Sequence, residues 1–225
     1  MSTPQRPLKI APSRWPRGSE WRRWDLHVHT PESRLGLPFG GQTWEQYVTA
    51  LETAAAEAKI SVIGVTDYMT LDGYERLFSE KDANGRLSTI DLLIPNIEFR
   101  MMPQTEDGKA LNLHLLIDPS EIDHIDKIRR ALRNLKFSYD GQPYGCFREE
   151  LIAFGRAQDP ELTDDEAAYT FGIQQFKPDR SVIKSWLDNE KWLRNNSLIG
   201  VANGKDGISG LPLDGFGAIR DEILK

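Results

Sequence analysis

The chain has 225 residues, of which 39% are hydrophobic and 28% are charged, an ordinary composition for a globular domain. Its net charge of −6 excludes a general basic surface for nucleic acid, so any recognition of phosphate must be local. The single cysteine, Cys146, excludes an internal disulfide framework, and four histidines leave few alternatives for a metal site with nitrogen ligands.

Residues 1–23 form a leader that is rich in proline and arginine. It lacks the apolar stretch of about 7–15 residues that a signal peptide needs, and no segment of the chain approaches the ~20 apolar residues of a membrane span. We therefore predict a cytoplasmic protein without a membrane partner. The leader is expected to pack on a domain formed by residues 24–225, anchored by Trp15, Trp21 and Trp24. An aromatic platform for a nucleic-acid base is the alternative role of these tryptophans.

The first predicted strand, residues 24–29, alternates Leu26 and Val28 with polar residues and so places His27 and His29 on one face. Thr43 can cap a helix that continues at helical spacing to Lys59. The next segment, residues 61–66, is continuously apolar and β-branched, which is typical of a strand buried on both faces. This strand ends on Asp67.

A helix is predicted over residues 71–80, followed by a strand over 91–97 that ends on Glu98 and a strand over 111–117 that contains His114. The alternation of strands and helices predicts a mostly parallel sheet, closed or nearly closed into a barrel. The second half is predicted to be mainly helical, over residues 120–135, 147–156, 164–171 and 180–189. A strand at 197–202 then leads into a glycine-rich loop at 203–210. Residues 218–225 have the pattern of a helix that stops without a cap, so we expect the chain to continue beyond Lys225 in a longer protein.

Histidine and acidic residues recur at or in the predicted strands, and in a parallel barrel the ends of the strands converge on one face. Two imidazoles in a His-x-His strand lie about 6–7 Å apart and could bind one ion, while Glu98 could bridge two ions. The positive charge of two such metal ions lets a bound water ionise near neutral pH and attack a phosphorus or carbonyl centre. Mixed nitrogen and oxygen ligands favour zinc, manganese or iron over calcium.

Each of these residues also has a structural interpretation. Asp67 could cap the helix that follows it, and Glu98 could be an exposed strand end. His114 could be a hydrogen-bonded core or surface residue, and His124, on a charged helix, is expected to be solvated. The conjunction of His27, His29, Asp67, Glu98 and His114, in order and each at a strand, favours the metal site.

Four segments resemble motifs of PHP (polymerase and histidinol phosphatase) domains. Asp25–Thr30 resembles their first motif, Gly64–Asp67 their second, Pro95–Glu98 their third, and Asn112–Leu115 their next histidine strand. The resemblance spans residues 24–117 and implies the family's distorted (β/α)7 barrel with one to three divalent transition metals, Mn, Zn or Fe. It implies metal ligation by His27, His29, Asp67, Glu98 and His114, and catalytic roles for Asp67, Glu98 and Tyr68.

The sequence departs from the family's pattern at two points. Tyr68 stands where the second motif usually continues with a histidine ligand, so one metal position is lost or filled differently. Tyr68 could instead hydrogen-bond the substrate or a water at the metal. The closing Asp-x-His motif is absent, since Asp206 is followed by Gly207 and Ile208, and it would lie beyond Lys225 if the chain continues.

Phosphate also needs cationic groups, for which Arg34, Arg100 and Lys205 are the candidates, with a solvated surface charge as the alternative for each. The leading hypothesis is a metal-dependent phosphoester hydrolase that acts on a nucleic acid or a nucleotide. An amidohydrolase is a second enzymatic alternative, but it needs a metal-bridging lysine at a later strand end, and none is well placed.

Residues 18–24 and the loop at 203–210 also resemble the PHP domain that precedes an AAA or SMC-like ATPase in TrlF-like bacterial proteins of anti-phage defence. That resemblance implies an ATPase domain as a partner, in cis or in trans. A catalytically degenerate PHP domain that acts as a sensor or interaction module for such an ATPase is therefore a further alternative. Homo-oligomerisation is left open.

Overall fold

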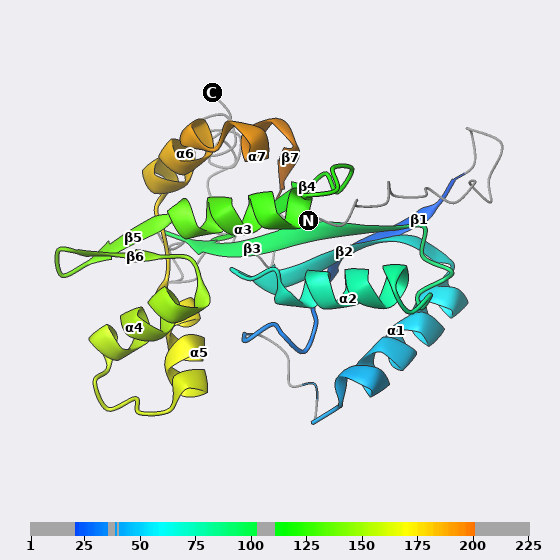
Figure 1. Cartoon of the computed structure of the whole chain (residues 1–225), viewed down its shortest axis with the longest axis horizontal. Helices are drawn as coiled ribbons and strands as arrows, with labels where there is room; N and C mark the ends of the chain where they lie inside the picture. Colours follow the sequence, from blue (N-terminus) through cyan, green and yellow to red (C-terminus); the bar gives the residue numbers. More distant parts are fainter. Residues whose placement is uncertain (1–20, 36–38, 40, 103–110, 201–225) are drawn as a thin grey trace, which may run out of the picture.

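A mixed α/β fold is built around one five-stranded sheet (Figure 1). The computed structural model describes residues 21–35, 39, 41–102 and 111–200. The strands of the sheet are β1 Arg23–Val28, β2 Ile60–Tyr68, β3 Leu92–Met101, β4 Leu111–Ile117 and β7 Ser197–Gly200, in the order β1-β2-β3-β4-β7. The pairs β1–β2 and β2–β3 are parallel, whereas β3–β4 and β4–β7 are antiparallel.

The described residues form seven helices. They are α1 Trp44–Ala58, α2 Asp72–Asp82, α3 His124–Asn134, α4 Arg148–Gln158, α5 Asp165–Gln175, α6 Arg180–Asn189 and α7 Lys191–Asn195. Figure 1 shows α4 and α5 packed as a pair beside a two-stranded hairpin, β5 Lys136–Tyr139 and β6 Gln142–Gly145, with α6 and α7 leading into β7. No described helix is both long enough and apolar enough to cross a membrane.

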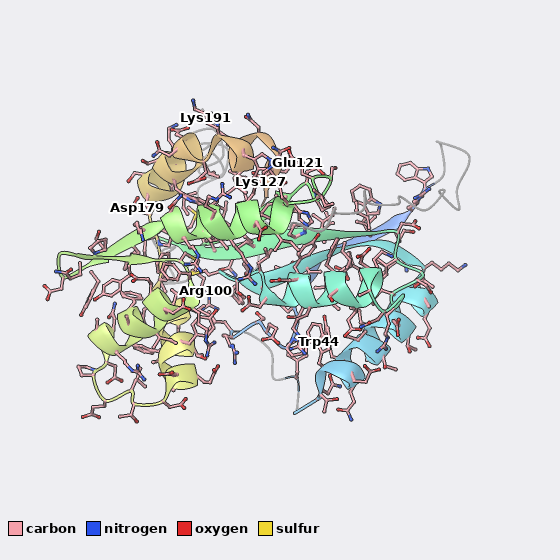
Figure 2. The ribbon with its side chains drawn as sticks, in the orientation of Figure 1. Trp44, Arg100, Glu121, Lys127, Asp179 and Lys191 are labelled. Atoms are coloured by element: carbon pink, nitrogen blue, oxygen red, sulfur yellow. The ribbon has the colours of Figure 1, made fainter. Side chains whose placement is uncertain are left out.

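The predicted start of α1 is confirmed at Thr43. Its side chain accepts a hydrogen bond from the backbone N–H of Gln46, and the Gln46 side chain accepts one from the Thr43 N–H, which forms a capping box. The helix ends where Lys59 adopts a left-handed conformation. Trp44, labelled in Figure 2, joins α1 to α2: its indole N–H donates to Glu80 at 3.1 Å, and the Arg76 guanidinium lies 3.9 Å from its ring centre.

The expected closed, mostly parallel barrel is not found in the described part of the chain, where the sheet is open and half of its strand pairings are antiparallel. The reason for the first reversal lies in the connection. Parallel neighbours need a crossover of about a dozen residues or more. Only nine residues, 102–110, join β3 to β4, so β4 has to return beside β3 in the opposite direction.

The tryptophans of the leader were expected to pack, but Trp21 is fully exposed and Trp24 is 58% exposed. These two side chains therefore do not anchor residues 21–24 in the described structure; Trp15 lies outside the described residues.

The backbones of α4 and α5 approach each other closely at two glycines. A β-carbon on Gly155 would lie 2.1 Å from the carbonyl oxygen of Ala168, and one on Gly172 would lie 2.0 Å from that of Leu151. The two helices can therefore pack this closely only because Gly155 and Gly172 have no side chain.

Candidate metal centre

Three strands of the sheet, β1, β3 and β4, position the residues of the centre. His27 lies in β1 and His29 directly after it, Glu98 lies in β3, and His114 is the cross-strand partner of Glu98 in β4. Between Asp25 and Val28 the register of β1 against β2 is irregular. Such irregularities re-aim side chains, and this one falls at His27. The two histidines therefore reach across β2 toward Glu98.

The imidazoles of His27 and His29 converge on the carboxylate of Glu98. Their Nε2 atoms lie 3.2 Å apart, and each lies 3.5 Å from Glu98 Oε2. One ligand atom from each residue falls within 4.8 Å of the other two. This cluster of His27, His29 and Glu98 is the one group of the described residues that the geometry marks as able to hold a metal ion.

The environment of Glu98 fits a cation. Its side chain is fully buried, and neither carboxylate oxygen has a well-formed hydrogen bond to a described residue. A buried carboxylate without hydrogen bonds is costly unless a positive charge compensates it. Burial by itself would raise the pKa of Glu98, but the neighbouring imidazoles of His27, His114 and His29 hold that pKa below its usual value. Glu98 is therefore ionised at neutral pH, and the donor set of two imidazoles and one carboxylate suits zinc, manganese or iron.

His114 lies at the side of the cluster rather than within it. Its ring meets that of His27 edge-on, with the centroids 4.7 Å apart. Asn96 Nδ2 lies 3.3 Å from His114 Nδ1 and also donates to the carbonyl of Leu26 and the hydroxyl of Thr66, each at 2.8 Å. Asn96 thus links β1, β2 and β4 through one amide and helps to orient the His114 ring.

Asn96 is not among the residues predicted for the site. Its signal was a polar residue inside an otherwise apolar strand, Leu92–Ile97, where an amide is tolerated only if it finds partners.

Asp67 binds a neighbouring loop instead of joining the cluster. Its carboxylate accepts hydrogen bonds from the backbone N–H of Thr30 at 2.9 Å and from the Thr30 hydroxyl at 2.8 Å. Gly73 packs so closely that a β-carbon there would lie 2.1 Å from Asp67 Oδ2. Because Thr30 follows His29 directly, Asp67 fixes the segment that presents one of the cluster's imidazoles. Burial outweighs the two hydrogen bonds and raises the pKa of Asp67 to about 7.

This shift predicts a pH-dependent difference between the wild type and Asp67→Asn. A carboxyl whose folded pKa of about 7 exceeds its ordinary 3.8 stabilises the fold below pH 4, and this contribution is lost as the pH rises toward 7. An asparagine mimics the protonated acid and does not titrate. In metal-free protein we expect the two unfolding free energies to be similar at pH 4, with the variant increasingly the more stable up to pH 7, as measured by urea denaturation. Asp82→Asn, at an exposed position, should show no such trend. If the difference in unfolding free energy between wild type and Asp67→Asn stays constant from pH 4 to pH 7, the pKa of Asp67 is not raised.

Tyr68 and Arg100 extend the centre on one side. The Tyr68 ring stacks on that of His29, with the centroids 5.3 Å apart, and burial together with the charge of Glu98 raises the pKa of Tyr68 to about 12. The phenol is therefore protonated at neutral pH and can donate a hydrogen bond. Arg100 lies two residues after Glu98 on β3, on the same face, with its guanidinium 5.0 Å from the Tyr68 ring centre. Figure 2 labels it near the end of the strand.

The other predicted residues lie apart from the cluster. Arg34 makes ion pairs with Glu166 at 3.0 Å and Glu32 at 3.9 Å, and Lys205 lies outside the described residues. The prediction that His124 is solvated is wrong: its side chain is buried, and its Nε2 lies 2.8 Å from the hydroxyl of Tyr74. The first turn of α3 packs against α2, which the charged residues around His124 did not indicate.

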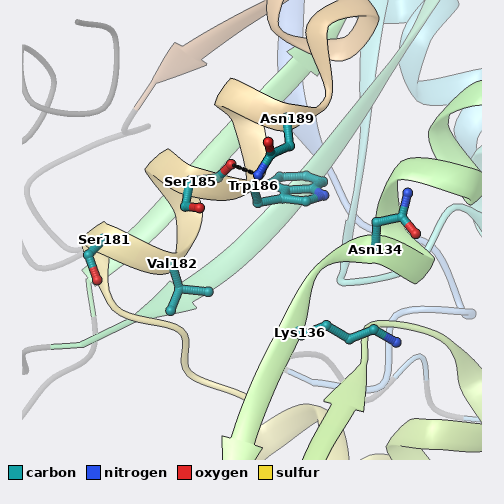
Figure 3. A pocket seen from close by; sticks show the side chains of 7 residues that line it. All are labelled: Asn134, Lys136, Ser181, Val182, Ser185, Trp186 and Asn189. Carbon is teal, nitrogen blue, oxygen red and sulfur yellow. Dashed lines mark hydrogen bonds between the residues drawn. The ribbon is translucent and has the colours of Figure 1, made fainter.

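Two surface cavities lie elsewhere in the described structure, and neither is lined by a residue of the cluster. The larger, about 310 Å³, lies between the end of α3 and α6 (Figure 3). Three of its polar side chains bond within the protein: Asn189 donates to the Ser185 carbonyl at 2.8 Å, Ser181 donates to Asp179 at 2.6 Å, and Asn134 donates to Glu190 at 2.7 Å. It therefore offers little chemistry of its own. The smaller cavity, about 210 Å³, has Met69, the residue after Tyr68, in its wall.

Comparison with known proteins adds little to this geometry. No family model matches the chain, and no curated protein matches it. This chain is similar to a solved structure, the crystal structure of a protein from Bifidobacterium adolescentis. That protein is named a metal-dependent phosphoesterase, an activity that was inferred for it. It shares 12% sequence identity with this chain at a TM-score of 0.44, over 89% of this chain and 74% of that one. Similarity of this degree decides neither the topology nor the activity of this protein.

Proposed function

We propose that His27, His29 and Glu98 bind divalent transition metal and that the protein is a metal-dependent phosphoester hydrolase of the PHP type. The observation that carries the proposal is the fully buried Glu98 carboxylate, which two imidazole Nε2 atoms approach to 3.5 Å. His114 would complete the ligand set for one to three ions, which we expect to be manganese, zinc or iron. The substrate class would be a nucleic acid or a nucleotide, and the full distorted (β/α)7 barrel is part of the same proposal.

The chain's own groups suit this chemistry. A bound divalent ion would activate water and stabilise negative charge on phosphate. Glu98 and the two histidines would hold the ion, and Asp67 would keep His29 in place through Thr30. The protonated phenol of Tyr68 would donate a hydrogen bond to a phosphate oxygen. Arg100, on the face of Glu98, would orient the phosphate through its guanidinium.

Arg100 also favours a phosphoester over the substrate of an amidohydrolase. An anionic substrate benefits from a guanidinium beside the metal ligands, whereas the amidohydrolase alternative needs a metal-bridging lysine. None of the five strands of the described sheet contains a lysine. The geometry thus favours phosphate chemistry.

The alternative of a degenerate interaction module rests on different residues. Tyr68 in place of a histidine and the absence of the closing Asp-x-His motif favour it. The role in anti-phage defence and the partner ATPase domain rest on residues 18–24 and 203–210, most of which lie outside the described structure. Both remain proposals.

Elemental analysis of the purified protein, followed by hydrolysis of bis(p-nitrophenyl) phosphate with added manganese, tests the function. We expect at least one bound transition metal per chain, and turnover that a chelator abolishes and manganese restores. The contrary result is a protein that is purified without metal and shows no turnover after manganese, zinc or iron is added. That result would contradict the hydrolase proposal and favour the interaction module.

A further inference from the structure

The wall of the smaller cavity begins at Met69, which follows Tyr68 of the candidate metal centre along the chain. Tyr68 stacks on His29, and the next residues along the chain form one wall of the cavity. Its lining comes from the turn after β2, from α3, from the start of α4 and from Tyr169 of α5. At about 210 Å³ it is smaller than the ~300–1,000 Å³ pockets that enclose whole ligands, so it suits one group of a larger molecule.

Arginines dominate the charge of this cavity. Arg129, Arg133 and Arg148 line it, against two carboxylates, Asp72 and Glu149. Arg129 and Arg133 are four residues apart on α3 and so lie on one face of that helix. Three guanidinium groups from two helices thus surround a space of the size of one anionic group.

The three arginines differ in their partners. Arg129 is paired with Asp72, at 2.9 Å, and with Glu75, and Arg148 is paired with Glu166. Arg133 has no carboxylate partner among the described residues. Its guanidinium lies 4.7 Å from the ring centre of Phe147, which holds the group in place without using its hydrogen-bond donors. Arg133 therefore offers its N–H groups for an incoming acceptor.

We propose that this cavity is a second phosphate-binding subsite, which holds a phosphate group of the substrate next to the one that reacts at the metal centre. The planar fork of Arg133 matches two phosphate oxygens. Arg129 and Arg148 line the same space, but carboxylate partners compensate their charges, so Arg133 carries the recognition. The subsite rests on the proposed hydrolase function and deepens it. It makes the preferred substrate a nucleotide or oligonucleotide that carries two neighbouring phosphate groups.

Titration calorimetry with inorganic phosphate tests the subsite without metal chemistry. The full chain is kept metal-free with a chelator, so that no metal ion at the cluster holds the anion. Arg133→Gln should weaken phosphate binding about tenfold or more, because it removes a charge-assisted hydrogen-bond pair. Arg133→Lys should lie between the two. The matched control is Arg130→Gln, an exposed arginine on α3 that does not line the cavity, and it should bind phosphate as the wild type does. Equal affinity of wild type and Arg133→Gln, or no binding by the wild type, overturns the subsite.

A matched pair of substrates separates this proposal from the hydrolase itself. A thymidine dinucleotide with a 5′-phosphate and one without it contain the same diester bond. We expect KM for the phosphorylated dinucleotide to rise about tenfold in Arg133→Gln, with KM for the other and both kcat values unchanged. If the wild type cleaves neither dinucleotide while the calorimetric difference holds, the hydrolase fails and the anion site stands. If it cleaves both and Arg133→Gln changes neither KM, the subsite fails and the hydrolase stands.

Discussion

A Glu98→Gln variant is expected to lose its bound transition metal and to hydrolyse phosphodiesters at least about a hundredfold more slowly. Mutation of a residue that only hydrogen-bonds a metal ligand already lowers metal affinity or activity about 10–100-fold, and Glu98 is proposed to be a ligand itself. The substitution keeps the shape of the side chain and removes its charge. The cluster would then offer two neutral imidazoles without the buried anion that draws a cation into it.

The same substitution should act differently on metal-free protein. There the neighbouring imidazoles hold the pKa of Glu98 below its usual value, so the ionised carboxylate stabilises the metal-free fold and a neutral amide loses that contribution. We therefore expect the Tm of chelated Glu98→Gln to lie below that of chelated wild type, while the rise in Tm on adding manganese disappears.

Elemental analysis and thermal unfolding with and without manganese measure both effects. Glu57→Gln, on the exposed side of α1, is the matched control and should behave as the wild type does. Full metal content in Glu98→Gln would show that the ion binds elsewhere.

The second large effect is expected at Gly155. Alanine favours a helix over glycine by up to about 1 kcal/mol. At this position, however, its β-carbon would lie 2.1 Å from the Ala168 carbonyl oxygen, a backbone atom that moves only if α4 and α5 separate. Overpacking of this kind costs about 1–3 kcal/mol, and loss of the aromatic packing of Phe154 on Phe176 would add to it. We expect Gly155→Ala to lower the free energy of unfolding by about 1–3 kcal/mol net.

Urea denaturation measures this loss. The control is Gly200→Ala in β7, where the nearest atom to the new β-carbon is 3.9 Å away and the substitution should be close to neutral. A Gly155→Ala variant as stable as the wild type would mean that the two helices have room to separate without cost.

Much of the local structure could be predicted because it is encoded locally. The unbroken apolar run of β2, the cap at Thr43 and the bounds of β4 each depend on neighbouring residues, and all three are found in the structure. The hairpin of β5 and β6 could have been predicted too. Asp140 and Gly141 both have positive φ, 47° and 77°, and Asp-Gly is a frequent hairpin turn.

The candidate site was predictable in its types of residue and less so in its partners. His27, His29 and Glu98 do come together, because strand periodicity fixes which face each occupies. The partner of Asp67 could not be read from the sequence: whether a carboxylate faces a metal or the Thr30 N–H depends on how the loop after β1 closes. The direction of β4 follows from a short connection that motif spacing alone does not reveal.

The strand order means that a metal ion at the cluster would also cross-link the edge of the sheet to its centre. Glu98 and His114 face each other across two central strands, whereas His27 and His29 come from the outermost strand β1, which is paired with β2 through an irregular register. An ion shared by these groups would close a loop of about 70 residues and so act as a staple, reducing the entropy of the unfolded chain. The residues proposed to carry out the chemistry would then also keep the sheet from fraying at its edge.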